Sequence, residues 1–191
     1  RSCPSYIYEA SFESQSLEEV LRRYQPKAVA ITGYITQEYL MLSYAKRAKA
    51  WNPDIVTIVG GSHAQLNYQR FYKPQITCIC RSDNIFAVAD LLEAKGILTP
   101  GEKAAPPLSE IDGLCYQEDG EWRANPCHPF DLNLLPFPDR SQFQKNQAHY
   151  RYLDAAPVAL LKTSSSCPYA CTFCYGRLLN CGSYRQRDIA S

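Results

Sequence analysis

Two short apolar runs separated by a helical stretch constrain the fold of this chain more than any other feature. Residues 28–32 read Ala-Val-Ala-Ile-Thr, and residues 55–59 read Ile-Val-Thr-Ile-Val. Nearly unbroken apolar runs of this length are typical of parallel strands that are buried on both faces of a sheet. Between them, residues 36–51 keep their apolar side chains at helical spacing. The sequence therefore predicts a strand, a helix and a second, parallel strand.

The same alternation extends to both sides of this unit. Residues 5–10 predict a short strand, and Ser16 with Glu19 forms the pattern of a capping box that opens a helix. Residues 76–80 predict a third buried strand, and residues 85–96 predict a helix that ends at a glycine. We therefore expect a doubly wound, mostly parallel α/β sheet of the flavodoxin or Rossmann kind, whose ligands bind beyond the carboxyl ends of its strands.

The chain changes character after Gly96. Asp119-Gly120 lies between two short strand-like segments and predicts a β-hairpin. Residues 158–163 predict a strand that leads into a cysteine-rich loop. We expect three parts along the chain: an α/β domain without its first strand in residues 1–99, a linker with the hairpin in residues 100–156, and the start of a further domain in residues 157–191.

Three cysteines lie close together in the last part. Cys167 and Cys171 are separated by three residues, Cys171 and Cys174 by two, and Phe173 directly precedes the last cysteine. Thiols that close on one short loop indicate a metal or cluster site. A cluster of four irons and four sulfides takes four thiolate ligands, so three cysteines would leave one iron open to a small molecule.

Two other readings of the cysteines are weaker. Structural zinc usually takes paired Cys-x-x-Cys units or a mixed Cys/His set, and the remaining candidate ligand here is Cys181. A disulfide scaffold is disfavoured because nine cysteines in 191 residues are sparse and odd in number. The other cysteines are expected to be core residues or ordinary thiols: Cys78 and Cys80 in a strand, and Cys3, Cys115 and Cys127 in isolation.

The spacing Cys-x-x-x-Cys-x-aromatic-Cys after a predicted strand resembles the cluster motif of the radical S-adenosylmethionine enzymes. The resemblance implies that Cys167, Cys171 and Cys174 bind a [4Fe-4S] cluster and that Phe173 lies in the S-adenosylmethionine site. The open iron would chelate the amino and carboxylate groups of S-adenosylmethionine. An electron supplied by a flavodoxin or ferredoxin would then cleave the sulfonium, and the resulting 5′-deoxyadenosyl radical would abstract hydrogen from a small-molecule substrate.

The order of segments resembles the members of this family that carry an N-terminal cobalamin-binding domain. That order is an α/β domain with Gly-Gly-Ser-His at residues 60–63, a loop at residues 81–84, a hairpin, a Leu-Pro-x-Pro crossing at residues 135–138, and the cysteine loop. The resemblance implies that the nucleotide tail of cobalamin threads between sheet and helices. The residues implied in binding cobalamin follow three successive strands: Thr32, Gly33, Tyr34, Gly60, Gly61, Ser62, His63, Arg81 and Ser82.

The chain departs from that family pattern in several places. It has no Asp-x-His-x-x-Gly, so cobalt would lack a histidine ligand from that motif. Residues 81–84 read Arg-Ser-Asp-Asn where members often carry Gly-Glu-Gly-Glu, and Ser165-Ser166 replaces an Arg-Gly before the first cysteine. A lone histidine such as His63 more often has a structural role than a ligand role. Arg185 and Arg187 either neutralise the cluster, anchor a carboxylate by a bidentate fork, or form a solvated surface pair.

Charge and hydropathy restrict the function further. Twenty basic and nineteen acidic residues leave a formal charge of +1 without a basic block, so no nucleic-acid partner is expected. No apolar run reaches the ~20 residues that span a bilayer, and a cytoplasmic location is expected. The first residue is Arg1 rather than Met, which suggests an excised fragment. The resemblance implies that residues 157–191 are only the first strand and cluster loop of a truncated radical S-adenosylmethionine barrel, so the fragment is expected to be inactive alone.

The expected function is that of a fragment of a cobalamin-dependent radical S-adenosylmethionine enzyme of the methyltransferase or cyclase type. It would act by methyl transfer or radical cyclisation on an unactivated carbon. Two alternatives stay open. The α/β domain of a radical S-adenosylmethionine protein need not bind cobalamin, and a zinc-stabilised binding module without catalysis would use the same cysteines.

Overall fold

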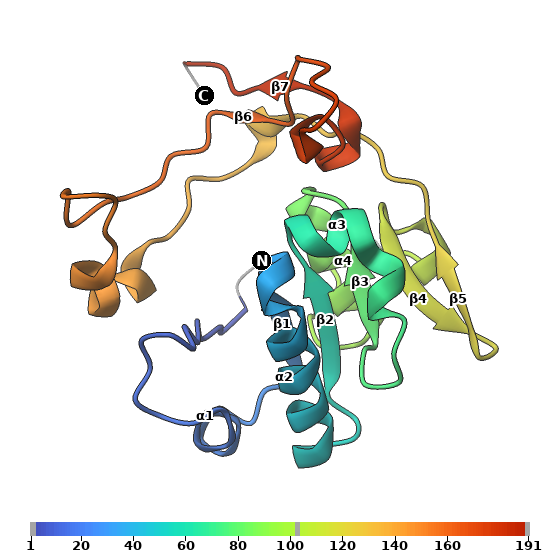
Figure 1. Ribbon diagram of the computed structural model, residues 1–191. Helices are drawn as coiled ribbons and strands as arrows, with labels where there is room; N and C mark the ends of the chain where they lie inside the picture. Colours follow the sequence, from blue (N-terminus) through green and yellow to red (C-terminus); the bar gives the residue numbers. More distant parts are fainter. Residues whose placement is uncertain (1–2, 102–103, 190–191) are drawn as a thin grey trace.

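A five-stranded sheet forms the centre of the computed structural model, which describes residues 3–101 and 104–189 (Figure 1). The strand order is β1 (Ala28–Thr32), β2 (Val56–Gly60), β3 (Cys78–Cys80), β4 (Leu114–Glu118) and β5 (Glu121–Ala124). The first three strands are parallel, and the β4–β5 hairpin continues the sheet in antiparallel fashion. The predicted fold class, a mostly parallel α/β sheet, is confirmed.

Helices cover both faces of the sheet, as doubly wound folds require. α2 (Glu38–Trp51) and α3 (Ser62–Asn67) pack on one face, where Met41, Ala45 and Phe71 are fully or almost fully buried. α4 (Ile85–Ala94) packs on the other face, with buried side chains contributed by the helix and by the strands. That second core consists of Ile58, Cys78, Cys80, Ala87, Leu91, Ile111, Leu114 and Tyr116.

α1 (Leu17–Tyr24) begins at the predicted capping box. The Ser16 hydroxyl accepts a hydrogen bond from the Glu19 amide, and the Glu19 carboxylate accepts one from the Ser16 amide at 2.7 Å. A cap of this kind stabilises a helix by about 1 kcal/mol. Leu21 then packs with Ala48 and Ile55 in a small third core, which fixes α1 beside α2.

The N-terminal segment forms no strand, and the prediction for residues 5–10 is wrong. Its polar groups bond to side chains of a 3-10 helical segment, η5 (Ser141–His149), instead of to a neighbouring strand. The Ile7 amide donates to Gln142 Oε1 at 2.8 Å, and Asn146 Nδ2 donates to Glu9 Oε2 at 2.7 Å. The sequence could not reveal that these groups find partners more than 130 residues away.

The predicted strand at residues 158–163 is also absent from the described part of the chain. Leu160 and Leu161 are exposed there, because no sheet lies beside them to cover an apolar strand. A two-residue strand, β6 (Ser164–Ser165), follows instead and pairs with β7 (Arg185–Gln186). The segment that connects β6 to β7 carries Cys167, Cys171 and Cys174, and we call it the cysteine loop.

The predicted hairpin at Asp119-Gly120 is confirmed. It belongs to the main sheet, because β4 pairs with β3, although the sequence places it in a linker. The proposed boundary at residue 99 stays a prediction. The remaining short 3-10 helices are η1 (Ile35–Gln37), η2 (Tyr68–Phe71), η3 (Leu108–Glu110), η4 (Leu132–Leu134), η6 (Tyr175–Arg177) and η7 (Asn180–Gly182). Across the described ranges, every helix is too short or too polar to cross a membrane.

Candidate functional site

The carboxyl edge of the parallel strands brings together the residues that follow β1, β2 and β3. Thr32 pairs with Gly60 at the end of the β1–β2 ladder, so the loops after these strands start side by side. Tyr34 is 68% exposed, and its amide donates to Gln37 Oε1 at 3.0 Å. Parallel α/β sheets bind their ligands beyond this edge. The loops after β1 and β2 therefore lie at the edge where such sheets bind their ligands.

Gly61 has a backbone conformation that favours glycine. It precedes α3 with φ +87° and ψ 178°, a region that other residues rarely adopt. A Cβ at this position would lie 2.2 Å from Thr32 Oγ1, far inside van der Waals contact. The Gly60-Gly61 turn therefore lets the chain enter α3 directly against the end of β1. Gly33, after β1, is also tight, because a Cβ there would lie 3.0 Å from Met41 Sδ.

His63 lies inside the protein, with only 5% of its surface exposed. Its Nε2 is 2.6 Å from Glu38 Oε2, and its Nδ1 is 3.2 Å from Asn67 Nδ2. Arg70 donates two hydrogen bonds to the Glu38 carboxylate, at 2.6 and 2.9 Å, which hold the pKa of Glu38 below its usual value. Nε2 thus joins α3 to Glu38 of α2, and Nδ1 is engaged by Asn67 within α3, so both imidazole nitrogens have partners inside the protein. A contact of His63 with cobalamin stays a prediction.

Arg81 and Ser82 follow β3 but turn toward the hairpin. The Arg81 guanidinium lies 4.1 Å from the centre of the Tyr68 ring, and Nη1 donates to the Asn125 carbonyl at 3.3 Å. Ser82 Oγ accepts from the Asn84 amide at 3.1 Å and closes the turn before α4. Both predicted residues are therefore partly buried and take part in shaping the loop.

The cysteine loop carries three free thiols. Cys167 is half-buried, Cys171 and Cys174 are exposed, and Phe173 is 91% exposed. Cys174 Sγ accepts a weak hydrogen bond from the Gly176 amide at 3.4 Å. Within residues 3–101 and 104–189, no three His, Cys, Asp or Glu side chains are arranged to hold a metal ion. Three thiols are suitable ligands for an iron–sulfur cluster, but in this structure they are not grouped closely enough to hold one.

Five of the other six cysteines fall into two groups, and the sixth, Cys3, is an exposed thiol. Cys127 and Cys181 form a disulfide with a Cα–Cα distance of 5.6 Å, so the expectation that Cys127 is an isolated thiol is wrong. Their separation of 54 residues gave no sequence signal for this pair. Cys78, Cys80 and Cys115 are buried in the sheet, and burial raises the pKa of Cys78 to about 11 and that of Cys80 to about 12. The prediction that Cys78 and Cys80 are core residues is confirmed.

Asp83 joins the loop after β3 to the base of the cysteine loop. Its carboxylate accepts hydrogen bonds from Arg185 Nη2 at 3.0 and 3.2 Å and from the Ser165 hydroxyl. Lys162 lies 3.9 Å away on the surface. Sequence reasoning assigned no role to Asp83, although it lies in the loop after the third strand, where ligand contacts were expected. Arg185 is a largely buried partner of the Asp83 carboxylate rather than part of a solvated pair.

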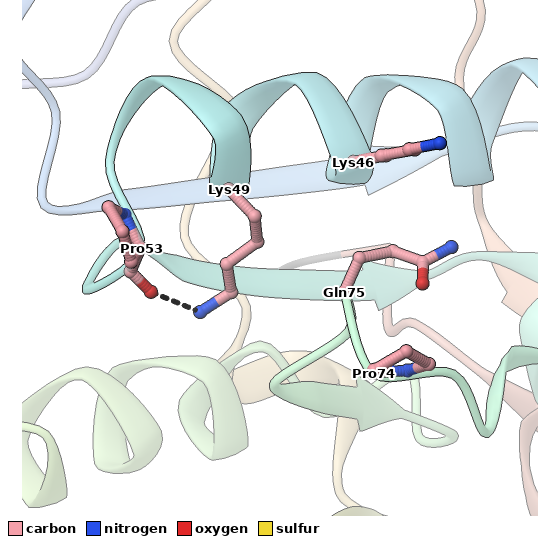
Figure 2. Close-up of a pocket in the computed structure, with 5 residues that line it drawn as sticks. All are labelled: Lys46, Lys49, Pro53, Pro74 and Gln75. Carbon is pink, nitrogen blue, oxygen red and sulfur yellow. Dashed lines mark hydrogen bonds between the residues drawn. The ribbon is translucent and has the colours of Figure 1, made fainter.

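A hollow at the opposite edge of the sheet lies away from all these residues. Figure 2 shows its lining by the end of α2, the turn after it and the segment before β3. Lys49 Nζ donates to the Pro53 carbonyl at 3.0 Å, and burial lowers the pKa of Lys49. The other residues around the hollow are Lys46, Pro74 and Gln75. Its position at the amino ends of the strands separates it from the predicted site.

Comparison with known proteins identifies the region that contains this carboxyl edge. Residues 4–97 match the family model of the B12 binding domain. This range contains the helix-covered parallel strands and all the predicted cobalamin residues. The match supports the presence of an α/β domain of the B12-binding type in the N-terminal half of the chain.

Curated relatives extend the similarity across most of the chain. It is 27% identical over 164 residues to an uncharacterized methyltransferase of Pyrococcus horikoshii, which covers 85% of this chain and 34% of that protein. It is 28% identical over 163 residues to an anaerobic magnesium-protoporphyrin IX monomethyl ester cyclase of Rubrivivax gelatinosus, over 83% of this chain and 28% of the cyclase. A cyclase of the same name from Cereibacter sphaeroides is 24% identical over 164 residues, 84% of this chain and 26% of the cyclase. The chain thus spans about a third or less of the length of these relatives.

Proposed function

We propose that this chain is the cofactor-binding part of a cobalamin-dependent radical S-adenosylmethionine enzyme. The main support for the proposal is the position of the cysteine loop relative to the sheet. Three free cysteines with the Cys-x-x-x-Cys-x-aromatic-Cys spacing are carried between β6 and β7, and the base of this loop is bonded to the loop after β3. These bonds connect the cysteine loop to the α/β domain at the carboxyl edge of the sheet, which supports the proposal that the two parts work together.

The residues at this edge fit a ligand that approaches the backbone closely. At Gly60, the last residue of β2, the nearest atoms to an added Cβ belong to Cys80 at 3.8 Å, so this position leaves room beside the backbone. The exposed Tyr34 ring and the hydroxyls of Thr32 and Ser62 would line the space above it. His63 and Glu38 join α3 to α2 beneath this edge and so orient the helix.

The cysteine loop fits a cluster by its donor chemistry. Cys167, Cys171 and Cys174 are all free, and two of them are exposed. Thiolate ligands suit iron–sulfur clusters, and binding would draw the three side chains together and order the loop. When bound, the cluster would supply the electron for reductive cleavage of S-adenosylmethionine, and cobalamin would carry a methyl group.

The reaction class follows from the same proposal and from the relatives. One relative is named a methyltransferase and two are named cyclases. We propose that the longer parent protein performs methyl transfer or radical ring closure on a small molecule, with a flavodoxin or ferredoxin as electron donor. The exposed Phe173 would become part of the S-adenosylmethionine site once the loop closes.

Anaerobic reconstitution of the longer parent protein with iron and sulfide tests this function. We expect four irons and four acid-labile sulfides per chain, and 5′-deoxyadenosine after reduction in the presence of S-adenosylmethionine. The triple variant C167A/C171A/C174A should lose both, whereas Cys3→Ser, at an exposed cysteine outside the loop, should keep both. Stoichiometric zinc without acid-labile sulfide would contradict the proposal and favour a zinc-stabilised binding module.

A further inference from the structure

Asp83 contacts both strands that flank the cysteine loop. The hydroxyl of Ser165 in β6 and the guanidinium of Arg185 in β7 donate to the same carboxylate. The loop that carries the cysteines leaves β6 and returns through β7. One side chain of the α/β domain therefore holds the departing and the returning end of the cysteine loop, which lies above α3 and α4 in Figure 1.

The Arg185 guanidinium is surrounded by acceptors. Nη1 donates to the Phe130 carbonyl at 2.9 Å, Nη2 donates to the Asn180 carbonyl at 3.0 Å as well as to Asp83, and Nε donates to the Ser183 carbonyl at 3.2 Å. Only a planar fork with several donors can make these bonds together, so lysine cannot replace arginine here. Arg185 thus joins the segment around Phe130, the end of the cysteine loop and the α/β domain.

The pair is largely removed from water. The Asp83 and Arg185 side chains are 10% and 13% exposed. Charge-assisted hydrogen bonds are strong in such surroundings, and removal of one partner leaves the other charge buried without compensation. Lys162 provides a contrast, since it is 62% exposed and 3.9 Å from Asp83. Exposed pairs of that kind contribute little.

A second contact ties the loop to the same edge of the sheet. The Asn180 amide donates to Gln65 Oε1 at 3.0 Å, and Gln65 belongs to α3, directly after β2. The base of the cysteine loop is therefore bonded to elements that follow β2 and β3. These are two of the three strands whose carboxyl ends form the proposed cobalamin site.

We propose that Asp83 and Arg185 form a latch that sets the separation between the cysteine loop and the cobalamin site. They are positioning residues in this proposal, because their hydrogen bonds go to the ends of the cysteine loop. This role rests on the proposed function, since a fixed separation matters only if both cofactors bind. The latch explains why β6 and β7 hold their place although they pair over only two residues each.

Hydrogen–deuterium exchange of the 191-residue chain tests the latch without any cofactor. Asp83→Asn and Arg185→Lys should each speed exchange of the amides in residues 164–187 by about tenfold or more. The effects of the two changes should be less than additive in the double variant, because both single changes remove the Asp83–Arg185 pair. Lys162→Gln is the matched control and should leave these rates unchanged. Unchanged protection of β2 in every variant shows that the sheet is intact.

Energy transfer to bound cobalamin tests the positioning itself. A fluorophore is attached to the exposed Cys171 in a chain whose other accessible thiols, at Cys3, Cys167 and Cys174, are replaced by serine. With cobalamin bound, we expect transfer at one well-defined efficiency. Asp83→Asn should lower the transfer and broaden the donor lifetimes while the cobalamin affinity stays the same.

The outcomes separate the latch from the proposed function. If the unaltered chain binds no cobalamin, the proposed function fails and the exchange experiment still decides whether the latch holds the loop. If cobalamin binds but exchange and transfer are the same in Asp83→Asn, Arg185→Lys and the unaltered chain, the latch is overturned and the proposed function stands.

Discussion

Replacing Gly61 by alanine adds a methyl group where the structure has no room for it. The new Cβ would lie 2.2 Å from Thr32 Oγ1, and the backbone has φ +87°. Two separate costs follow. The residue would occupy a backbone region that is almost reserved for glycine, and its methyl group would collide with a side chain from the end of β1.

The two costs have known sizes. A residue other than glycine in this backbone region loses about 1–3 kcal/mol, and overpacking of a tight site loses about 1–3 kcal/mol. We therefore expect Gly61→Ala to lower the free energy of unfolding by about 2–6 kcal/mol, a large fraction of the ~5–15 kcal/mol of a typical domain.

Two further variants isolate the steric part. Gly96→Ala is the matched control, because Gly96 also has a positive φ, +66°, but no atom lies within 4 Å of its added Cβ. It should cost only about 1–2 kcal/mol. Thr32→Ala removes the colliding oxygen and leaves the Thr32 Cβ position 3.4 Å away. In that background, Gly61→Ala should lose about 1–3 kcal/mol less than in the native chain.

Urea unfolding followed by far-ultraviolet circular dichroism measures these differences, with equal m-values as the check that the unfolding transition is comparable. The reasoning is refuted if Gly61→Ala costs no more than Gly96→Ala. It is also refuted if the cost is the same whether residue 32 is threonine or alanine. Either result would mean that the turn after β2 is not packed against β1.

Three other predictions concern stability and thiol chemistry. Glu38→Gln should destabilise the chain by about 1 kcal/mol at pH 7, and because the bonds from Arg70 hold the pKa of Glu38 below 4.5, this difference should vanish as the pH falls below that value. A urea-unfolding difference that does not shrink as the pH falls below 4.5 would contradict this. Ser16→Ala should cost about 1 kcal/mol in the same assay, and no loss would argue against the cap. Alkylation at pH 8 should quickly modify the exposed thiols and spare the buried ones until unfolding, as resolved by peptide mass spectrometry: Cys3, Cys171 and Cys174 against Cys78, Cys80 and Cys115. Rapid modification of a buried thiol in the folded chain would show that the sheet is open.

Local sequence signals predicted the elements whose interactions are local. The capping box at Ser16, the Asp119-Gly120 hairpin and the apolar runs of β1, β2 and β3 are all present in the structure. Each depends on neighbouring residues or on burial in one sheet. The carboxyl edge could be anticipated for the same reason, because parallel strands place the residues that follow them together.

Long-range partners were beyond the reach of these signals. Residues 158–163 are apolar enough for a strand, yet they lack a sheet to join, and the sequence cannot show whether an edge lies nearby. Asp83 and Arg185 are 102 positions apart, and Cys127 and Cys181 are 54 apart. His63 has a pattern that suits a ligand, whereas its burial beside Glu38 depends on how α2 packs against α3. Such contacts depend on the tertiary arrangement, and no periodic pattern or local motif in the sequence indicates them.

Titration of the 191-residue chain with hydroxocobalamin tests the central claim most directly. We expect a shift of the corrin absorption bands that saturates at one cobalamin per chain, with micromolar or tighter affinity. Tyr34→Ala, at the carboxyl edge, should weaken binding by about tenfold, whereas Tyr152→Ala, equally exposed but outside that edge, should not. An unchanged spectrum, or equal affinity of both variants and the native chain, would contradict a cobalamin site at the carboxyl edge of the sheet.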